Sequence, residues 1–199
     1  MTDIDIAVGG ADGQVPLARA VDLVAAAGPE PAVRLRDRTG DDPALDPSLV
    51  AAYLAGALPD TVRPRFLVDA PTTRNAPFNL ARRIQSVHRA TGGHTGLVLH
   101  TGDGDEVSDT VAGEEPASSD DQWSEYAQVL TGLWGTFPAE ALVGDQESGV
   151  AVDESLITPL NHRGRHYRVA GPLDGPADPS GPPPLFAVDG DGALTEVTP

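Results

Sequence analysis

Residues 72–101 read TTRNAPFNLARRIQSVHRATGGHTGLVLHT and contain a turn, a helix and a strand in succession. Asn75 is a residue type that caps helices, and Pro77 suits the first helical turn. Gly92-Gly93 ends the helical pattern, and residues 96–100 form an apolar run typical of a strand. The apolar face of the helix is formed by residues at helical spacing: Leu80, Ile84, Val87 and Thr91.

The same alternation of strand and helix extends toward the N-terminus. The predicted strands are Ile4–Val8, Ala32–Leu35, Arg65–Val68 and Gly96–His100. The predicted helices before residue 72 are Val15–Ala27 and a second that Asp46 caps and that runs from Pro47 to Leu58. This βαβαβαβ order predicts a parallel α/β sheet with right-handed crossovers, but it does not decide between an open sheet and a barrel.

The second half of the chain is less regular. Residues 102–121 are acidic and polar, which predicts a loop, and Ser119 or Asp120 can begin a helix that carries Trp123 to Trp134. Residues 143–183 are rich in turn residues and form a long excursion. The strands predicted here are His166–Val169 within that excursion, Pro184–Val188 as the fifth strand of the sheet, and Ala193–Val197. We expect residues 1–199 to form a single domain.

Composition and charge exclude several functions. The net charge is −17, which disfavours binding to nucleic acid and to anionic membranes. All 13 basic residues are arginine, so a Schiff-base lysine and a P-loop are excluded. The sequence contains no cysteine. Neither a signal peptide nor an apolar run long enough to span a bilayer is visible in it, so we expect a cytoplasmic protein.

Two stretches resemble the bacterial luciferase-like, flavin-dependent monooxygenases, in the branch that includes nitrilotriacetate-type and desulfurization monooxygenases. The first is residues 72–101, with its threonine pair, PFNLARR helix and Gly-Gly turn. The second is residues 126–185, where LW, DQESG, HRGRHYRVAGPL and SGPPP occur in the family's order. The resemblance implies a (β/α)8-barrel fold with FMN at the carboxyl ends of the strands. It also implies oxygen activation on reduced flavin that a separate reductase supplies.

The resemblance assigns cofactor binding to four positions that follow strands: Asp37, Thr72, Thr73 and Thr101. If the strands are parallel, all four lie at one rim. Each has a simpler interpretation. Asp37 can be a solvated turn residue, the threonine pair can cap the following turn, and Thr101 can be a strand end without a ligand.

Other features depart from the family pattern. A full barrel needs about 250 residues, so we expect the last strands and helices of the barrel to be missing. We also expect a second subunit to cover the open sheet. The family's phosphate-binding Gln-Ala-Gly-Ser-like turn is replaced by residues 187–192, AVDGDG, whose carboxylates repel phosphate. Val98 replaces an asparagine, and Asp120 replaces a tyrosine.

These departures favour a non-catalytic or weakly flavin-binding homologue that acts as a homodimer or as the partner of a full-length family member. An active FMN-dependent monooxygenase with a shortened barrel, and a small-ligand binding or scaffold protein, are the alternatives. No metal site is predicted. His162 and His166 have i, i+4 spacing, but Gly164 and Pro159 argue against a helix. The Asp103-Gly-Asp105 and Asp189-Gly-Asp191 pieces lack the remainder of a calcium loop.

Overall fold

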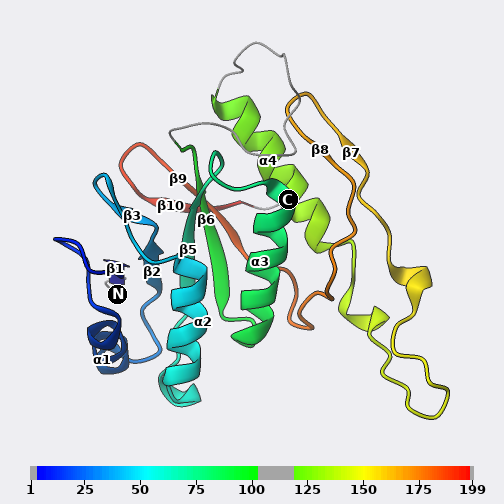
Figure 1. Cartoon of the computed structure of the whole chain (residues 1–199), viewed down its shortest axis with the longest axis horizontal. Coiled ribbons are helices and arrows are strands. Elements are labelled where there is room, and N and C mark those ends of the chain that lie inside the picture. The colour runs from blue at the N-terminus through cyan, green and yellow to red at the C-terminus, as the bar shows by residue number, and fades with distance from the viewer. Residues whose placement is uncertain (1–3, 103–118, 198–199) are drawn as a thin grey trace. The chain divides into compact units, whose positions relative to one another are not determined.

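The computed structural model describes residues 4–102 and 119–197, in which strands and helices alternate along the chain (Figure 1). The described residues form two compact units. The first comprises residues 4–70, 87–99 and 183–197, and the second comprises residues 71–86, 100–102 and 119–182. That the whole chain forms one domain stays a prediction. Residues 103–118, most of the acidic stretch predicted to be a loop, lie outside the described residues.

A mixed sheet is the centre of the first unit, and its strand order among the described residues is β1-β2-β5-β6-β9-β10. β1 pairs with β2, β2 with β5, and β6 with β9, in each case in parallel. The β5–β6 pair is parallel too. Phe66 N donates to His94 O and Thr72 N donates to His100 O, so the residue numbers increase in the same direction along both strands. The strands are Ile4–Ala7 (β1), Val33–Arg36 (β2), Phe66–Pro71 (β5), Thr95–His100 (β6), Leu185–Val188 (β9) and Leu194–Val197 (β10).

The described part of the chain thus contains the βα order of an incomplete (β/α)8 barrel, and the predicted strand positions are confirmed to within a few residues. β10 differs from the others because it runs antiparallel to β9. The connection between them is a tight turn at residues 189–193, where a parallel βα repeat would place a helix. A short hairpin that the sequence did not predict, β3 (Arg38–Thr39) with β4 (Asp42–Pro43), follows β2.

The helices begin and end where the sequence chemistry indicates. They are Leu17–Ala27 (α1), Pro47–Ala57 (α2), Pro77–Ala90 (α3) and Ser119–Trp134 (α4). Asp46 caps α2 as predicted, because its Oδ1 accepts a hydrogen bond of 2.9 Å from Ser48 N. α1 begins two residues later than predicted, because Val15 N donates to Ala7 O beside β1. One face of the sheet is largely apolar, and each large apolar side chain buried there contributes about 1.5–3 kcal/mol. These buried residues include Val33, Leu35, Phe66, Val68, Leu97 and Leu99.

α4 and the excursion that follows it form the core of the second unit. Tyr126 and Tyr167 are fully buried, and their rings meet edge to face with centroids 5.3 Å apart. Trp134 Nε1 donates to Ala81 O at 3.0 Å, which ties the end of α4 to α3. Tyr126 and Trp134 of α4 are thus part of the core, whereas Trp123 is half-buried.

The excursion contains a hairpin of two short strands, β7 (His162–Arg163) and β8 (Arg168–Val169), and three-residue helical turns, η2 (Ala139–Ala141) and η3 (Glu154–Leu156). A third such turn, η1 (Asp60–Val62), follows α2. The prediction of one strand at His166–Val169 was wrong at its start, because the amides of His166 and Tyr167 donate to the Glu125 carboxylate. No helix among the described residues is long and apolar enough to cross a bilayer.

Candidate functional site

The four sequence-predicted residues follow the carboxyl ends of three neighbouring strands. Asp37 follows β2, Thr72 and Thr73 follow β5, and Thr101 follows β6. Asp37 is half-buried, the threonine pair is buried, and Thr101 is exposed. Parallel strands present their carboxyl ends at one edge, the position where α/β proteins place their ligands. Their assignment to cofactor binding stays a prediction.

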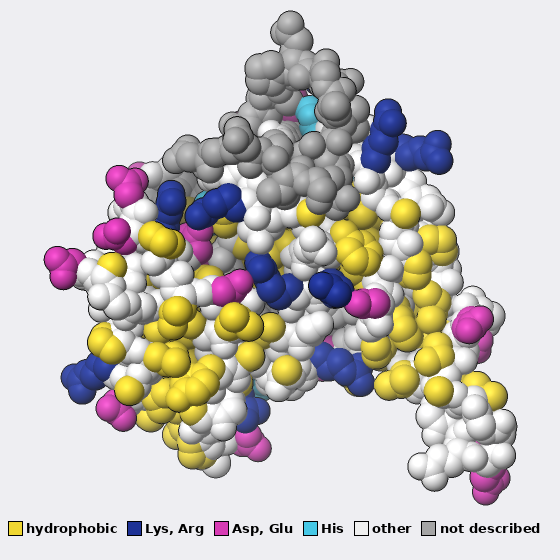
Figure 2. Space-filling model, in the orientation of Figure 1, with side chains coloured by type: hydrophobic (Ala, Val, Ile, Leu, Met, Phe, Trp, Pro, Cys, Tyr) yellow, Lys and Arg dark blue, Asp and Glu magenta, His cyan; other side chains and the backbone are white. Residues whose placement is uncertain are grey.

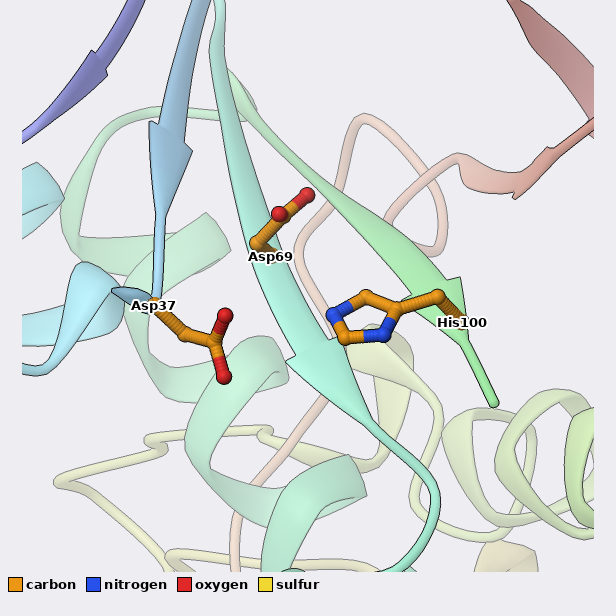
Figure 3. Close-up of side chains that lie close together, drawn as sticks. All are labelled: Asp37, Asp69 and His100. Atoms are coloured by element: carbon orange, nitrogen blue, oxygen red, sulfur yellow. The ribbon is translucent and has the colours of Figure 1, made fainter. Parts of the chain in front are cut away.

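A buried ion pair lies between β2 and β5, and sequence reasoning missed it. Arg34 Nε and a terminal guanidinium nitrogen donate to the two carboxylate oxygens of Asp69 at 2.8 and 3.3 Å. The side chains are 9% and 3% exposed. Figure 3 shows Asp69 on β5 beside the end of β2, where Asp37 lies, and His100 at the end of β6. Because Arg34 already neutralises Asp69, this carboxylate is a poor candidate for a metal ligand.

The second unit brings the segments after β5 and β6 together. Thr72 N donates to His100 O at 2.9 Å. A Cβ atom on Gly102 would lie 2.3 Å from Thr73 Oγ1 and 2.5 Å from Pro71 Cβ, so only glycine allows this approach of the two segments. The threonine pair and the Thr101–Gly102 segment therefore form one packed structure, which is compatible with the capping interpretation of the threonines.

The predicted role of Asn75 as the cap of α3 was wrong. α3 begins at Pro77, so Ala76 precedes the helix, and Ala76 O accepts from Leu80 N. The Asn75 side chain instead donates to Pro71 O at 3.2 Å and accepts from Arg83 at 2.8 Å. Tyr126 Oη donates to Asn75 O at 2.7 Å. Asn75 thus joins the turn after β5 to both helices of the second unit.

The turn after β9 is where the family resemblance places the flavin phosphate. The amides of Asp191, Gly192 and Ala193 are already bonded inside the turn. Asp189 Oδ1 accepts from Asp191 N at 3.0 Å and from Ala193 N at 2.8 Å, and Gly192 N donates to Asp189 O at 3.0 Å. A phosphate would have to displace a carboxylate that holds these donors and would meet its charge. The residues present therefore do not fit the phosphate of FMN.

The other two altered positions also lack what the resemblance implies. Val98 is fully buried in β6 and offers no polar group where an asparagine is expected. Asp120 is exposed in the first turn of α4, where a carboxylate suits the positive end of the helix dipole. A structural role thus explains both residues.

Glu125 on α4 organises the β7–β8 hairpin. Its carboxylate accepts from His162 Nε2 at 2.9 Å and from the amides of Arg165, His166 and Tyr167 at 3.1, 2.9 and 2.9 Å. Burial alone would raise the pKa of Glu125, but the hydrogen bonds and the charge of His162 outweigh burial and lower it. His162 and His166 therefore serve the hairpin in different ways, one by its ring and the other by its amide.

Comparison with known proteins shows which proteins the chain resembles. No family model matches the chain. N-acetyl-S-(2-succino)cysteine monooxygenase of Bacillus subtilis is 26% identical over 126 residues, which are 62% of this chain and 29% of that protein. A pristinamycin IIA synthase subunit of Streptomyces pristinaespiralis is 30% identical over 169 residues, 80% of this chain and 56% of that protein.

The solved structure of EDTA monooxygenase from Chelativorans sp. BNC1 is 28% identical and superposes with a TM-score of 0.63 over 83% of this chain and 42% of that chain. The fold is thus that of a partial barrel, similar to the barrels of these monooxygenases. These homologues and structural neighbours support the luciferase-like flavin-dependent monooxygenase family for this chain, at low sequence identity. The chain spans about a quarter to a little over half of the length of the curated relatives it matches.

Proposed function

We propose that this protein is a luciferase-like homologue that binds flavin weakly or not at all and acts through association with another subunit. The observation that carries the proposal is the Asp189 carboxylate, which accepts hydrogen bonds from the Asp191 and Ala193 amides of the turn after β9. In this family the flavin supplies the oxygen chemistry and the protein positions it. A chain that cannot hold the flavin phosphate loses the strongest anchor for that positioning.

The outer face of α2 supports the association. α2 is an 11-residue helix, PSLVAAYLAGA, without a charged residue, and Leu49 and Tyr53 on its outer face are 68% and 51% exposed. Leu45, just before the helix, is 48% exposed. Figure 2 shows hydrophobic side chains gathered over α2. A helix that is apolar on all sides is normally covered.

A second copy of this chain is the occupant that we propose for the α2 face. Two chains of net charge −17 repel one another over most of their surfaces, and a charge-free helix gives them a place to meet. Ala52 and Gly56 lie at helical spacing with Leu49 and Tyr53, and small residues allow two helices to approach closely. The alternative to a homodimer is a complex with a full-length family member. One relative is itself named as a subunit, which is compatible with such a complex.

The flavin part is tested by titrating the protein with FMN and with riboflavin and following flavin fluorescence. We expect weak binding of both at micromolar flavin, with affinities within about threefold of each other, because the phosphate gains no contact at the turn after β9. A phosphate seated on backbone amides would instead favour FMN by at least about tenfold. Asp189→Ser should raise the preference for FMN. Asp191→Ser is the matched control, because it removes the same charge from the turn and leaves the Asp189 bonds in place.

The association part is tested by sedimentation. We expect a dimer for the unaltered protein and a monomer for Leu49→Glu, with Ala18→Glu on the exposed face of α1 as the control for added charge. An unaltered protein that stays monomeric at micromolar concentration contradicts the homodimer. A full-length family member that then binds the protein, and not its Leu49→Glu variant, supports the heteromeric form.

An active enzyme with a shortened barrel is the second candidate, and the strand-end residues favour it. Asp37, Thr72, Thr73 and Thr101 follow parallel strands as a flavin-ring site requires, and a ring held there could leave its phosphate in solvent. Oxygen consumption that depends on NADH and a flavin reductase, and that falls in Asp37→Ala, would establish this activity. A small-ligand or scaffold role is the third candidate, for which thermal shifts with polyamines in place of FMN are the test.

A further inference from the structure

The β7–β8 hairpin is a concentration of positive charge on a strongly acidic protein. Residues 162–168 read HRGRHYR and contain three arginines and two histidines without a carboxylate, whereas the chain as a whole has a net charge of −17. Figure 2 shows arginine side chains gathered beside this hairpin. A local cluster of this kind attracts anions even where the overall charge repels them.

Two of these arginines face one another. Arg163 of β7 is the register partner of Arg168 of β8, so their side chains lie on the same face of the hairpin. Both are exposed, and within the ranges 4–102 and 119–197 neither guanidinium forms an ion pair. Like charges directly opposite in an antiparallel pair destabilise it. The sequence thus retains an unfavourable pair that an anion would turn into a favourable one.

The hairpin is held in this arrangement from its other side. The Glu125 carboxylate already accepts hydrogen bonds from His162 and from three amides of the turn. A Cβ atom on Gly164 would lie 2.0 Å from Glu125 Oε1 and 2.5 Å from His162 Nε2, so only glycine permits the turn to close on Glu125. A preorganised turn lowers the cost of holding two arginines for a ligand.

A cavity accompanies the arginine pair. It has a volume of about 500 Å³ and is lined by Asn161–Gly164 and by Arg168–Ala170, all of which belong to the second unit. This volume falls within the range of small-molecule sites. The cavity therefore has room for an organic group in addition to the anion that the arginines bind.

We propose that the β7–β8 hairpin binds a phosphate monoester, with its phosphate between Arg163 and Arg168 and its organic part in the cavity. A phosphate is a better ligand for two guanidinium groups than a single carboxylate is. The phosphate carries nearly two negative charges at pH 7 and has three acceptor oxygens. This site lies in the excursion and is distinct from the turn after β9.

The test is titration calorimetry at low salt with ribose 5-phosphate, ribose, inorganic phosphate and succinate. We expect ribose 5-phosphate to bind with a dissociation constant on the order of 1 mM, the range of two charge-assisted contacts. Inorganic phosphate should bind more weakly and ribose not at all. Arg163→Gln and Arg168→Gln should each weaken binding about tenfold, and Arg19→Gln, an exposed arginine on α1, should leave it unchanged.

Thermal stability provides a second measurement that does not depend on calorimetric heat. Without phosphate at low salt, Arg163→Gln should be at least as stable as the unaltered protein, because it removes a like-charge pair. Ribose 5-phosphate should raise the Tm of the unaltered protein but not that of the double variant, in which Arg163→Gln and Arg168→Gln are combined. Equal binding by the double variant, equal weakening by Arg19→Gln, or no binding to the unaltered protein would each overturn the proposal. Succinate that binds as tightly as ribose 5-phosphate would overturn the assignment to phosphate.

Discussion

Replacement of Glu125 should destabilise the second unit more than any single exposed glutamate can. The carboxylate accepts four hydrogen bonds, from His162 Nε2 and from the amides of Arg165, His166 and Tyr167, and its side chain is 12% exposed. In Glu125→Ala these donors lose their acceptor, while the hairpin that carries them stays packed on α4 through Tyr126 and Tyr167.

The size of the effect follows from the burial of those donors. A buried donor left without an acceptor costs about 1–3 kcal/mol, and such contributions are not additive. The Arg165 amide is exposed and can bond to water, so the His166 and Tyr167 amides and the His162 ring dominate. We expect Glu125→Ala to lower the free energy of unfolding by about 3 kcal/mol. This loss corresponds to a decrease in Tm of about 6–12 °C for a chain of this size.

Urea unfolding followed by tryptophan fluorescence measures this effect directly, because both tryptophans, Trp123 and Trp134, lie on α4 with Glu125. Glu125→Gln retains the shape and removes the charge, so it should lose about half as much stability. Glu140→Gln is the matched control, an exposed glutamate in η2, beyond the end of α4. If Glu125→Ala and Glu140→Gln shift the urea midpoint equally, the Glu125 network does not stabilise the fold.

The same network predicts a pH dependence with a definite sign. The pKa of Glu125 is lowered in the folded state, so its contribution to stability is complete above the ordinary glutamate pKa of about 4.3. That contribution is lost as the pH falls through the lower folded value. The stability difference between the unaltered protein and Glu125→Gln should therefore be constant near neutral pH and shrink below about pH 4. A difference that grows on acidification contradicts the assignment.

Three further substitutions probe other parts of the structure. Arg34→Met should lower the free energy of unfolding by about 3–5 kcal/mol because it leaves Asp69 buried and unpaired, and Arg34→Met with Asp69→Leu should recover much of that loss in urea unfolding. Gly164→Ala should destabilise the second unit and should add little in the Glu125→Ala background, because its Cβ atom displaces the Glu125 carboxylate; additive Tm losses would contradict this coupling. Trp134→Phe should cost about 1 kcal/mol in urea unfolding through the lost bond to Ala81 O, and an unchanged midpoint would show that water replaces it.

The periodic part of the fold was predictable from sequence. All four helices lie within two residues of their predicted starts, because Asp46, Pro47, Pro77 and the Gly92-Gly93 pair mark boundaries by local chemistry. The strands of the sheet were found as apolar runs between these helices. The parallel order followed from the alternation itself, since a helix between two strands returns the chain to the same end of the sheet.

The remainder depended on contacts between distant residues. Arg34 alternates with Val33 and Leu35 as a solvated strand residue would, and nothing local indicates that Asp69, 35 residues later, neutralises it. Asn75 has the composition of a cap but bonds to Pro71 and Arg83 instead. The strand predicted at residues 166–169 fails at its start for the same reason, because Glu125 on another element competes for its amides.

The turn after β9 links the fold to the proposed loss of flavin binding. A parallel βα repeat leaves free amides at the carboxyl end of a strand, and these are the donors that barrels of this type offer to phosphate. Here the chain reverses into antiparallel β10, and such a tight turn needs an acceptor for its own amides. Asp189 supplies that acceptor with its side chain, so the residue that stabilises the hairpin also removes the donors. Phosphate binding and the β9–β10 turn are therefore alternatives at this position, and Asp189→Ser should improve one at the expense of the other.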